Sequence, residues 1–319
     1  MKILVTGGAG FIGSNFIKYI LSKYPNYKII NIDKLTYAGN PDNLKEVARH
    51  KNYQFVKADI NNAAVVGQAM AKCEAVVHCA AETHVDRSIK NAQDFIETNF
   101  NGTYVLLEAA LKNKVKKFVH VSTDEVYGSR PKGFFKEADP LNPSSPYSAS
   151  KAASDILARS YFITFKLPVM ITRCSNNFGP NQYPEKVIPL FVTNLIEGKK
   201  VPLYAKGENV RDWIYVEDHC RAVDIVLHKG RPGEIYNIAG ESYKTNIALT
   251  QAILKYMGQN SSMIEHVKDR LGHDFRYAVD CSKVSALGFH PQVSFEAGLR
   301  RTIDWYQRNE RWWKKLQRK

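Results

Sequence analysis

The chain is 319 residues long, with 44% hydrophobic and 24% charged residues. That balance is typical of a folded globular protein and excludes wholesale disorder, and the length allows one large core or two that share an interface. The net charge of +14 suits polyanionic small ligands. No RNA- or DNA-binding motif accompanies it, so no nucleic-acid partner is expected.

Neither a signal peptide nor a membrane span is expected. No basic stretch precedes an apolar segment at the start of the chain, and no uninterrupted apolar run approaches ~18 residues. The cysteines are odd in number, widely spaced and without a Cys-x-x-Cys pair, which argues against a disulfide framework or a zinc site. We therefore expect buried thiols, a cytoplasmic location and no bound metal.

The first half of the chain alternates short apolar runs with amphipathic segments, the pattern of βαβ units. The runs are apolar throughout rather than at alternate positions, which indicates a parallel sheet covered by helices on both faces. The sequence therefore predicts a Rossmann-type, doubly wound α/β fold. We expect strands at Lys2–Thr6, Lys28–Asp33, Tyr53–Lys57, Ala75–Cys79, Lys117–Ser122 and Pro168–Arg173, and helices at Gly13–Lys23, Asn62–Lys72, Gln93–Asn113 and Pro146–Phe165.

Beyond about residue 175 the pattern loosens, because prolines interrupt the segments. A helix near Val216–Lys229 and a strand at Glu234–Ala239 still fit the sheet. Ligands are expected where the strand carboxyl ends meet a smaller, partly interleaved second domain. The predicted division is a sheet domain of residues 1–175, with 212–239 packing back onto it, and a substrate domain of residues 176–211 and 240–319.

The end of the chain, Arg300–Lys319, holds eight Lys or Arg residues against two acids. Its aromatic residues have the spacing of a packing face, so we expect one helix with a solvated basic side. Those aromatic residues are Trp305, Tyr306, Trp312 and Trp313.

Gly7, Gly10 and Gly13 form a G-x-x-G-x-x-G turn between the first predicted strand and the first helix. Such a turn lets the backbone approach a pyrophosphate, whose charge then lies at the helix N-terminus. Asp33 ends the next strand, and a carboxylate there accepts hydrogen bonds from an adenosine ribose and repels a 2′-phosphate. The pattern predicts NAD rather than NADP, although Lys34 could soften that preference.

Two further strand ends fit the same groove. Asp59 follows the third strand and Ala80–Ala81 follows the fourth. Singly each is an ordinary turn residue, but together they fit the adenine and ribose edges of a dinucleotide.

Tyr147 and Lys151 are four residues apart and therefore share one face of a predicted helix. A free phenol has a pKa of about 10 and is a poor base at neutral pH. A nearby ammonium and a positive nicotinamide ring stabilise the phenolate, which then takes a hydroxyl proton as a hydride leaves. Ser122–Thr123, at the end of the preceding strand, offers hydroxyls to the same substrate oxygen.

In this order, the glycine turn, the Ser/Thr strand end and Tyr-x-x-x-Lys resemble the extended short-chain dehydrogenase/reductase superfamily. Asp124 and Glu125 come directly after Thr123, where epimerases of this superfamily usually lack two adjacent acids. The pair supplies what a dehydration needs, because one carboxylate removes a carbon-bound proton and one carboxylic acid protonates the departing hydroxide. Elsewhere such acids would be ordinary solvated loop residues.

Several blocks in order, over nearly the whole chain, resemble the dTDP-glucose 4,6-dehydratase family. The resemblance implies an internal redox cycle in which Tyr147 deprotonates the C4 hydroxyl while NAD⁺ takes the C4 hydride. Glu125 and Asp124 then eliminate water across C5 and C6, and the hydride returns to C6. The blocks are Ala80–Ser88, Thr123–Glu125, Ser145–Lys151, Arg173–Gln182, Gly207–Trp213 and Asp269–Asp274.

The resemblance also implies the site residues. Catalysis is expected of Thr123, Asp124, Glu125, Tyr147 and Lys151. NAD is expected at Gly7, Gly10, Phe11, Ile12, Gly13, Asp33, Lys34, Leu35, Thr36, Asp59, Ile60, Ala80, Ala81, Glu82, Thr98, Tyr147, Lys151 and Asn177. The nucleotide sugar is expected at Thr83, Thr123, Asn176, Lys186, Val187, Pro202, Tyr204, Arg211, Asn246, Arg270 and His273.

Arg211 and Arg270 suit a pyrophosphate because a guanidinium fork binds oxyanions in bidentate fashion. Three positions depart from the family pattern: Thr83 stands where Ser is frequent, Leu271 where Pro is usual, and Phe275 where a basic residue is common. The last two bear on the substrate side and on which nucleotide sugar is used.

Alternatives remain. They are the same dehydration on UDP-glucose, a UDP-sugar 4-epimerase or UDP-glucuronate decarboxylase, and, more distantly, a non-catalytic protein that senses NAD. The resemblance further implies a homodimer through Gln93–Asn113 and Pro146–Phe165.

Overall fold

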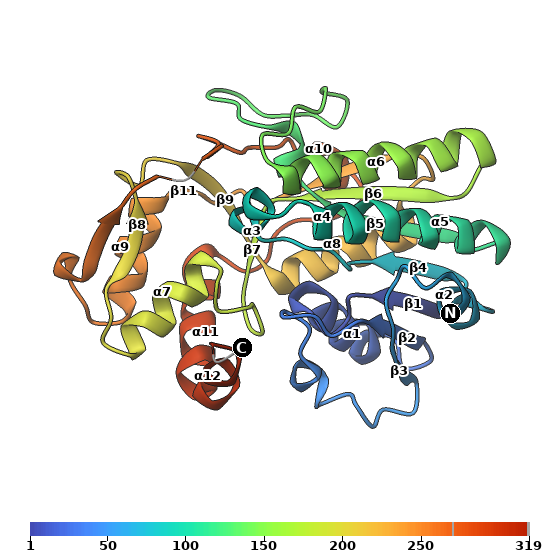
Figure 1. Ribbon diagram of the computed structural model, residues 1–319, viewed down its shortest axis with the longest axis horizontal. Helices are drawn as coiled ribbons and strands as arrows, with labels where there is room; N and C mark the ends of the chain where they lie inside the picture. Colours follow the sequence, from blue (N-terminus) through green and yellow to red (C-terminus); the bar gives the residue numbers. More distant parts are fainter. Residues whose placement is uncertain (270, 318–319) are drawn as a thin grey trace.

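The computed structural model describes residues 1–269 and 271–317. Its larger part is a seven-stranded sheet of order β10-β6-β5-β4-β1-β2-β3, and every neighbouring pair in it is parallel. Helices flank the sheet, and a smaller lobe lies beside it (Figure 1). The predicted Rossmann-type fold is confirmed. The strands are β1 (Lys2–Thr6), β2 (Lys28–Asp33), β3 (Tyr53–Lys57), β4 (Ala75–His78), β5 (Lys117–Thr123), β6 (Val169–Cys174) and β10 (Ile235–Ile238).

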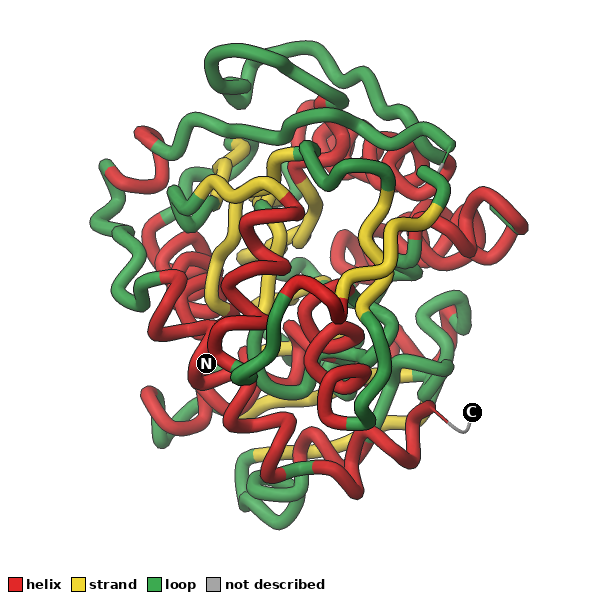
Figure 2. The backbone as a smooth tube through the Cα atoms, turned by 90° about the vertical axis from the view of Figure 1, so that its left-hand side faces the viewer, coloured by secondary structure: helices red, strands yellow, loops and turns green. Residues whose placement is uncertain are grey.

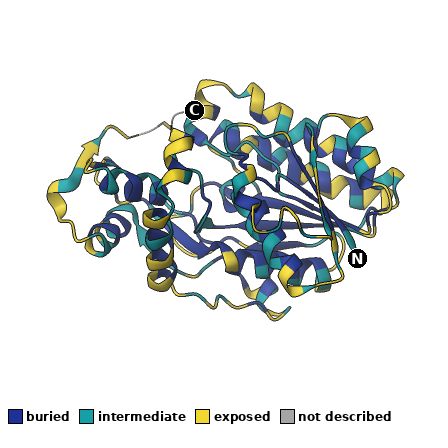
Figure 3. Cartoon of the chain, turned by 90° about the horizontal axis from the view of Figure 1, so that it is seen from below, coloured by how far each residue is buried: buried dark blue, intermediate teal, exposed yellow. Residues whose placement is uncertain are grey.

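Strand side chains alternate between two cores, one on each face of the sheet. Ile3 and Val5 of β1 pack in the first core with α1 (Phe11–Lys23) and α8 (Val216–Lys229). Leu4 packs in the second core with helices α2 (Ala63–Met70), α5 (Gly102–Lys112) and α6 (Pro146–Phe165). Figure 3 shows the buried strands between these layers. The edge strand β3 is the exception, since most of its side chains are exposed or half-buried.

The segment predicted as one helix over Gln93–Asn113 has an irregular start. After the short α4 (Gln93–Phe95), one wide π-type turn covers Ile96–Asn101 before α5 begins. Such turns interrupt helices at functional sites, and here the turn places Asn99 to bind the backbone of Glu82 through both its side-chain oxygen (2.9 Å) and nitrogen (3.0 Å). The segment after β4 is thereby fixed.

The smaller lobe has its own core around Phe178, Trp213 and Trp313. Its strands form two sheets, of order β11-β9-β7 and β12-β8. Figure 2 shows this lobe from the side, with strands and helices interleaved. Its elements are β7 (Asn176–Phe178), α7 (Val187–Ile196), β8 (Val201–Tyr204), β9 (Val210–Tyr215), β11 (Tyr243–Thr245), α9 (Asn246–Tyr256) and β12 (Ile264–Val267).

The end of the chain forms two helices rather than one, α11 (Phe295–Arg308) and α12 (Glu310–Gln317). Its aromatic face does pack as predicted, because Tyr306 and Trp313 are fully buried. No helix within the described residues is long and apolar enough to cross a membrane. Short helical elements complete the chain: η1 (Pro41–Leu44), α3 (Val85–Lys90), η3 (Asp124–Tyr127), η4 (Ser261–Met263) and α10 (Ser282–Ser285).

Candidate active site

The glycine turn after β1 leaves no room for side chains. Gly7 has φ +67°, and a Cβ on it would lie 2.6 Å from the Cα of Ala80, which follows the neighbouring strand β4. A Cβ on Gly13 would lie 2.4 Å from the carbonyl oxygen of Gly7. Gly10, the N-cap of α1, has no side chain to bond the first N–H groups of the helix. The turn therefore fits a dinucleotide pyrophosphate.

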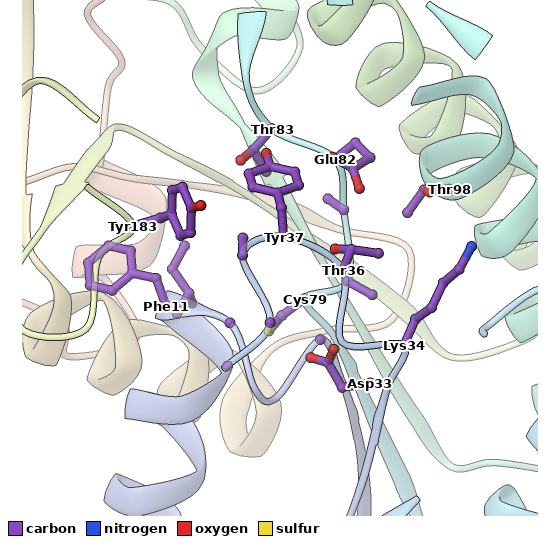
Figure 4. A pocket seen from close by; sticks show the side chains of 18 of the residues that line it. Phe11, Asp33, Lys34, Thr36, Tyr37, Cys79, Glu82, Thr83, Thr98 and Tyr183 are labelled. Carbon is purple, nitrogen blue, oxygen red and sulfur yellow. The ribbon is translucent and has the colours of Figure 1, made fainter. Parts of the chain in front are cut away.

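Asp33 braces this turn from the end of β2. Its Oδ2 accepts a hydrogen bond from the backbone N–H of Ala9 at 2.9 Å, and its Oδ1 accepts one from Leu35 at 2.8 Å. Burial raises the pKa of Asp33, and the two N–H groups oppose that shift. Each oxygen has a further lone pair for a ribose hydroxyl, and the side chain lines the pocket in Figure 4.

Lys34 does not act as a separate positive charge at this end of the groove. Its Nζ lies 2.6 Å from Oδ2 of Asp59. The groove therefore presents the carboxylates Asp33 and Asp59 against one ammonium, which favours an adenosine ribose without a 2′-phosphate.

The pocket contains most residues expected to bind the cofactor. Leu35 does not line the pocket; its backbone N–H donates a hydrogen bond to Asp33 instead. Asn177, Tyr147 and Lys151 do not line it either, although Oδ1 of Asn177 is buried and has no hydrogen-bond partner within residues 1–269 and 271–317. The expected residues that line it are Gly7, Gly10, Phe11, Ile12, Gly13, Asp33, Lys34, Thr36, Asp59, Ile60, Ala80, Ala81, Glu82 and Thr98.

One group of pocket residues was missed by sequence reasoning. Tyr37 and Tyr183 lie near Phe11 in Figure 4, and their rings are in edge contact at 5.2 Å. The Arg87 guanidinium lies 3.8 Å from the centre of the Tyr37 ring, and its Nη2 lies 2.9 Å from Oε2 of Glu185. No local pattern marks these contacts, because they join three distant segments.

Thr123 ends β5 and organises the residues that follow. Its Oγ1 accepts a hydrogen bond from the backbone N–H of Glu125 at 3.2 Å, and it donates to Oδ1 of Asp124 at 3.3 Å. It is also hydrogen-bonded to the hydroxyl of Tyr147. One side chain thus connects the two acids to the phenol.

Asp124 is buried in a way that favours its protonated form. Burial, followed by the charges of Glu125 and Asp212, raises the pKa of Asp124 well above its usual range. Its Oδ2 has no hydrogen-bond partner among the described residues. A neutral carboxylic acid is the form that protonates a departing hydroxide, while Glu125 lines the neighbouring pocket.

Tyr147 and Lys151 lie one turn apart on α6, and both are buried. The ammonium of Lys151 donates to the carbonyl oxygen of Val121 at 2.9 Å, and burial lowers its pKa. Burial and then the charge of Glu125 raise the pKa of Tyr147 well above its ordinary value. The surrounding protein therefore keeps the phenol protonated, and a phenolate requires a further positive charge, which an oxidised nicotinamide ring carries.

A second pocket adjoins the first and shares Thr83, Glu185 and Lys186 with it. Nζ of Lys186 donates to the carbonyl oxygen of Thr83 at 2.8 Å. Thr123 does not line this pocket, and Arg270 lies outside the described residues. The expected substrate residues that line it are Thr83, Asn176, Lys186, Val187, Pro202, Tyr204, Arg211, Asn246 and His273.

The guanidinium of Arg211 is less open to a ligand than expected. Its Nη1 donates to the carbonyl oxygen of Val210 at 2.8 Å and its Nη2 to that of Asp274 at 2.9 Å. Its guanidinium also lies 4.2 Å from the centre of the Tyr277 ring. Arg211 therefore brings a fixed positive charge to the pocket, with part of its donor set already used.

Comparison with known proteins agrees with this geometry. The family model described as GDP-mannose 4,6 dehydratase matches residues 4–302. A dTDP-glucose 4,6-dehydratase of Streptomyces niveus is 51% identical over 99% of this chain and 96% of that protein. The crystal structure of a Streptomyces venezuelae dTDP-glucose 4,6-dehydratase with NAD bound superposes with a TM-score of 0.97 at 51% identity, covering 99% of this chain and 100% of that one.

The chain belongs to the dTDP-glucose 4,6-dehydratase family. A UDP-glucose 4-epimerase of Thermotoga maritima is a more distant neighbour of this family member, with 30% identity, a TM-score of 0.90, and coverage of 97% of this chain and 100% of that one. The cofactor of this dehydratase is NAD, as its glycine turn and Asp33 predict.

Two of the departures from the family pattern lie at the surface of this dehydratase. Leu271 is 76% exposed and Phe275 is 48% exposed. Thr83, the third, lies between the two pockets and keeps a hydroxyl there. No group of three or more His, Cys, Asp or Glu side chains within residues 1–269 and 271–317 is placed to hold a metal ion.

Proposed function

We propose that this chain converts dTDP-glucose into dTDP-4-keto-6-deoxyglucose. The observation that carries the proposal is the buried Asp124, whose pKa is raised, next to Glu125, with both linked through Thr123 to the hydroxyl of Tyr147. An epimerization or a decarboxylation needs no acid for a departing hydroxide. A dehydration needs one, and it also needs a base one carbon away.

The cofactor is proposed to lie in the groove of Gly7, Gly13 and Asp33, whose glycines admit no Cβ and whose carboxylate suits a ribose. Bound NAD⁺ supplies the acceptor of a hydride from C4 and later the donor of that hydride to C6. In this scheme residues 1–175 and 212–239 hold the cofactor, and residues 176–211 and 240–319 hold the nucleotide sugar.

The side chains then divide the proton transfers. Tyr147 takes the proton of the C4 hydroxyl, and Thr123 orients its phenol. The resulting ketone acidifies the C5 proton, which Glu125 removes. Asp124 gives its proton to the C6 hydroxyl, the C6–O bond breaks, and water leaves.

The proposal is tested with purified protein, a panel of nucleotide sugars and no added cofactor. We expect dTDP-glucose to give a product with the ultraviolet absorbance of an alkaline 4-keto sugar. A larger kcat/KM with UDP-glucose than with dTDP-glucose would favour the first alternative, in which the same dehydration acts on UDP-glucose. Absence of the chromophore with both sugars would refute the dehydratase function, and interconversion of sugars without loss of water would favour the epimerase alternative.

We also propose a homodimer formed through α5 and α6. Their outer face exposes several large apolar side chains, including Ile156 (63% exposed) and Ile163 (56% exposed) one above the other on α6, with Tyr104 on α5. We expect the Ile156→Asp, Ile163→Asp variant to sediment as a monomer. Phe55→Asp is the matched control, since Phe55 is exposed on the edge strand β3, and a monomeric unaltered chain would refute the dimer.

The cytoplasm is the proposed location. Its support is the state of the five cysteines, which are all free. Secreted proteins usually pair such residues.

A further inference from the structure

Two catalytic elements must be held in register for this reaction. Tyr147 and Lys151 lie on the helix α6, whereas Asp124 and Glu125 lie on η3, a four-residue turn that is followed by Gly128. A turn of this kind has poor internal hydrogen-bond geometry and needs outside support. The groups act at C4, C5 and C6 of one sugar ring, so a small displacement of η3 relative to α6 misplaces the acid and the base.

A buried chain of contacts joins the two elements away from the pockets. Arg173, on β6, has its Nε 2.8 Å from Oδ2 of Asp155, which lies one turn beyond Lys151 on α6. Nη1 of the same guanidinium donates to the hydroxyl of Tyr127 at 2.8 Å, and Tyr127 is the last residue of η3. Arg173, Asp155 and Tyr127 are each at most 3% exposed.

The phenol of Tyr127 has all its hydrogen-bonding capacity used. It accepts from Arg173 and donates to Oδ1 of Asn237 on β10 at 2.8 Å. Its ring stacks on that of Phe135, with the ring centres 4.9 Å apart and an angle of 9° between the ring planes. In the sheet Arg173 is the register partner of both Ser122 and Asn237, so it is fixed from either side.

We propose that Tyr127, Arg173 and Asp155 are positioning residues that hold the elimination acids in register with the redox pair. None of them lines either pocket, so they act through η3 and α6 rather than on the substrate. This role rests on the proposed function, because it assumes that Asp124 and Glu125 carry out the elimination.

The variant that tests the role is Tyr127→Phe, which keeps the ring and its stacking and removes only the hydroxyl. In a single turnover with dTDP-glucose we expect C4 oxidation within about twofold of the unaltered chain and elimination slower by about tenfold or more. Reduced cofactor, seen by its near-ultraviolet absorbance, then accumulates before product forms. Arg173→Lys keeps a positive charge near Asp155 but loses the planar fork, and it should give the same signature.

Tyr161→Phe is the matched control. Tyr161 is also a buried tyrosine whose hydroxyl binds a side chain, that of Glu108, but it lies near the far end of α6. It should leave both steps unchanged. The positioning role is overturned if Tyr127→Phe slows oxidation and elimination equally, or slows neither, while the unaltered chain turns over normally. Absence of turnover by the unaltered chain would overturn the proposed function itself.

Discussion

Two aspartates at the carboxyl edge of the sheet show how differently one side chain is used in this molecule. Asp33 ends β2 and accepts two backbone N–H groups, one on each oxygen. Asp124 follows β5, receives only the hydroxyl of Thr123, and leaves Oδ2 without a partner among the described residues. Both are buried.

The difference lies in the donors that reach each carboxyl group. Backbone N–H groups oppose the effect of burial at Asp33, whereas burial and the neighbouring charge of Glu125 act together at Asp124. Donors favour the charged form, and their absence favours the neutral one. Asp33 is therefore suited to accept hydrogen bonds from a cofactor, and Asp124 to donate a proton.

The largest effect is expected for Asp124→Asn, which keeps the shape of the side chain and removes the acidic proton. Turnover should fall by about 10²- to 10⁴-fold, because protonation of the leaving hydroxyl is lost. C4 oxidation should continue, so enzyme-bound reduced cofactor should accumulate in stopped-flow absorbance. If no reduced cofactor forms at all, Asp124 has a role in the oxidation step and the contrast with Asp33 fails.

The next largest effect is expected for Asp33→Ala, which removes the carboxylate that accepts two backbone hydrogen bonds and is proposed to accept a ribose hydroxyl. Loss of a hydrogen bond to a charged group costs about 1.5–3 kcal/mol, so the Kd for NAD should rise by roughly 10- to 100-fold. Calorimetric titration of cofactor-free protein measures it. Asp59→Ala is the comparison, since Asp59 pairs with the exposed Lys34 and should change the Kd by much less. Equal effects would show that charge alone, rather than bracing of the glycine turn, sets the affinity.

The pH dependence gives a third, smaller effect. The pKa of Asp124 is raised, so its carboxyl group keeps the proton to a higher pH than an ordinary aspartate does and loses it as the pH rises through that raised value. We expect the elimination rate to fall with rising pH, by about tenfold per unit beyond the raised pKa, while cofactor binding through Asp33 stays constant over the same range. A rate that rises through that range would mean that Asp124 acts as a base.

Much of the cofactor half could be predicted from the sequence. Its strands are continuous apolar runs, and the residues that line the first pocket lie at or just after their ends, as Gly7, Asp33 and Ala80 do. Predicted strand bounds differ from the observed ones by one residue at most, since β4 ends at His78 and β5 reaches Thr123. Local signals were sufficient there because the geometry is local.

Other features of the site could not be predicted, because they depend on contacts between distant segments. Nothing near Arg87 in the sequence indicates that it lies over Tyr37 and beside Glu185. For Arg211 the sequence likewise predicted a guanidinium that is open to a pyrophosphate. Only the fold shows that the backbone carbonyl of Asp274 already accepts one of its hydrogen bonds. The wide turn before α5 was hidden for the same reason, since its purpose is to reach Glu82.

The smallest expected effect concerns stability, and it separates the two aspartates by sign. A carboxyl group whose pKa is raised by folding stabilises the fold below its unfolded pKa, and that contribution is lost as the pH rises toward the folded value. An asparagine does not ionise, so Asp124→Asn removes this loss of stability. At neutral pH the cofactor-free variant should therefore melt a few degrees higher, the shift that about 1 kcal/mol produces in a protein of this size. The gain should vanish below about pH 3, where this carboxyl group is protonated in both the folded and the unfolded state of the unaltered chain. Asp33→Asn should do the reverse and lower the melting temperature, because an amide nitrogen would then face an N–H group at Ala9 or Leu35. Melting curves of both variants across this pH range decide the matter, and a gain at both positions would mean that burial alone, rather than the donors around each carboxyl group, distinguishes them.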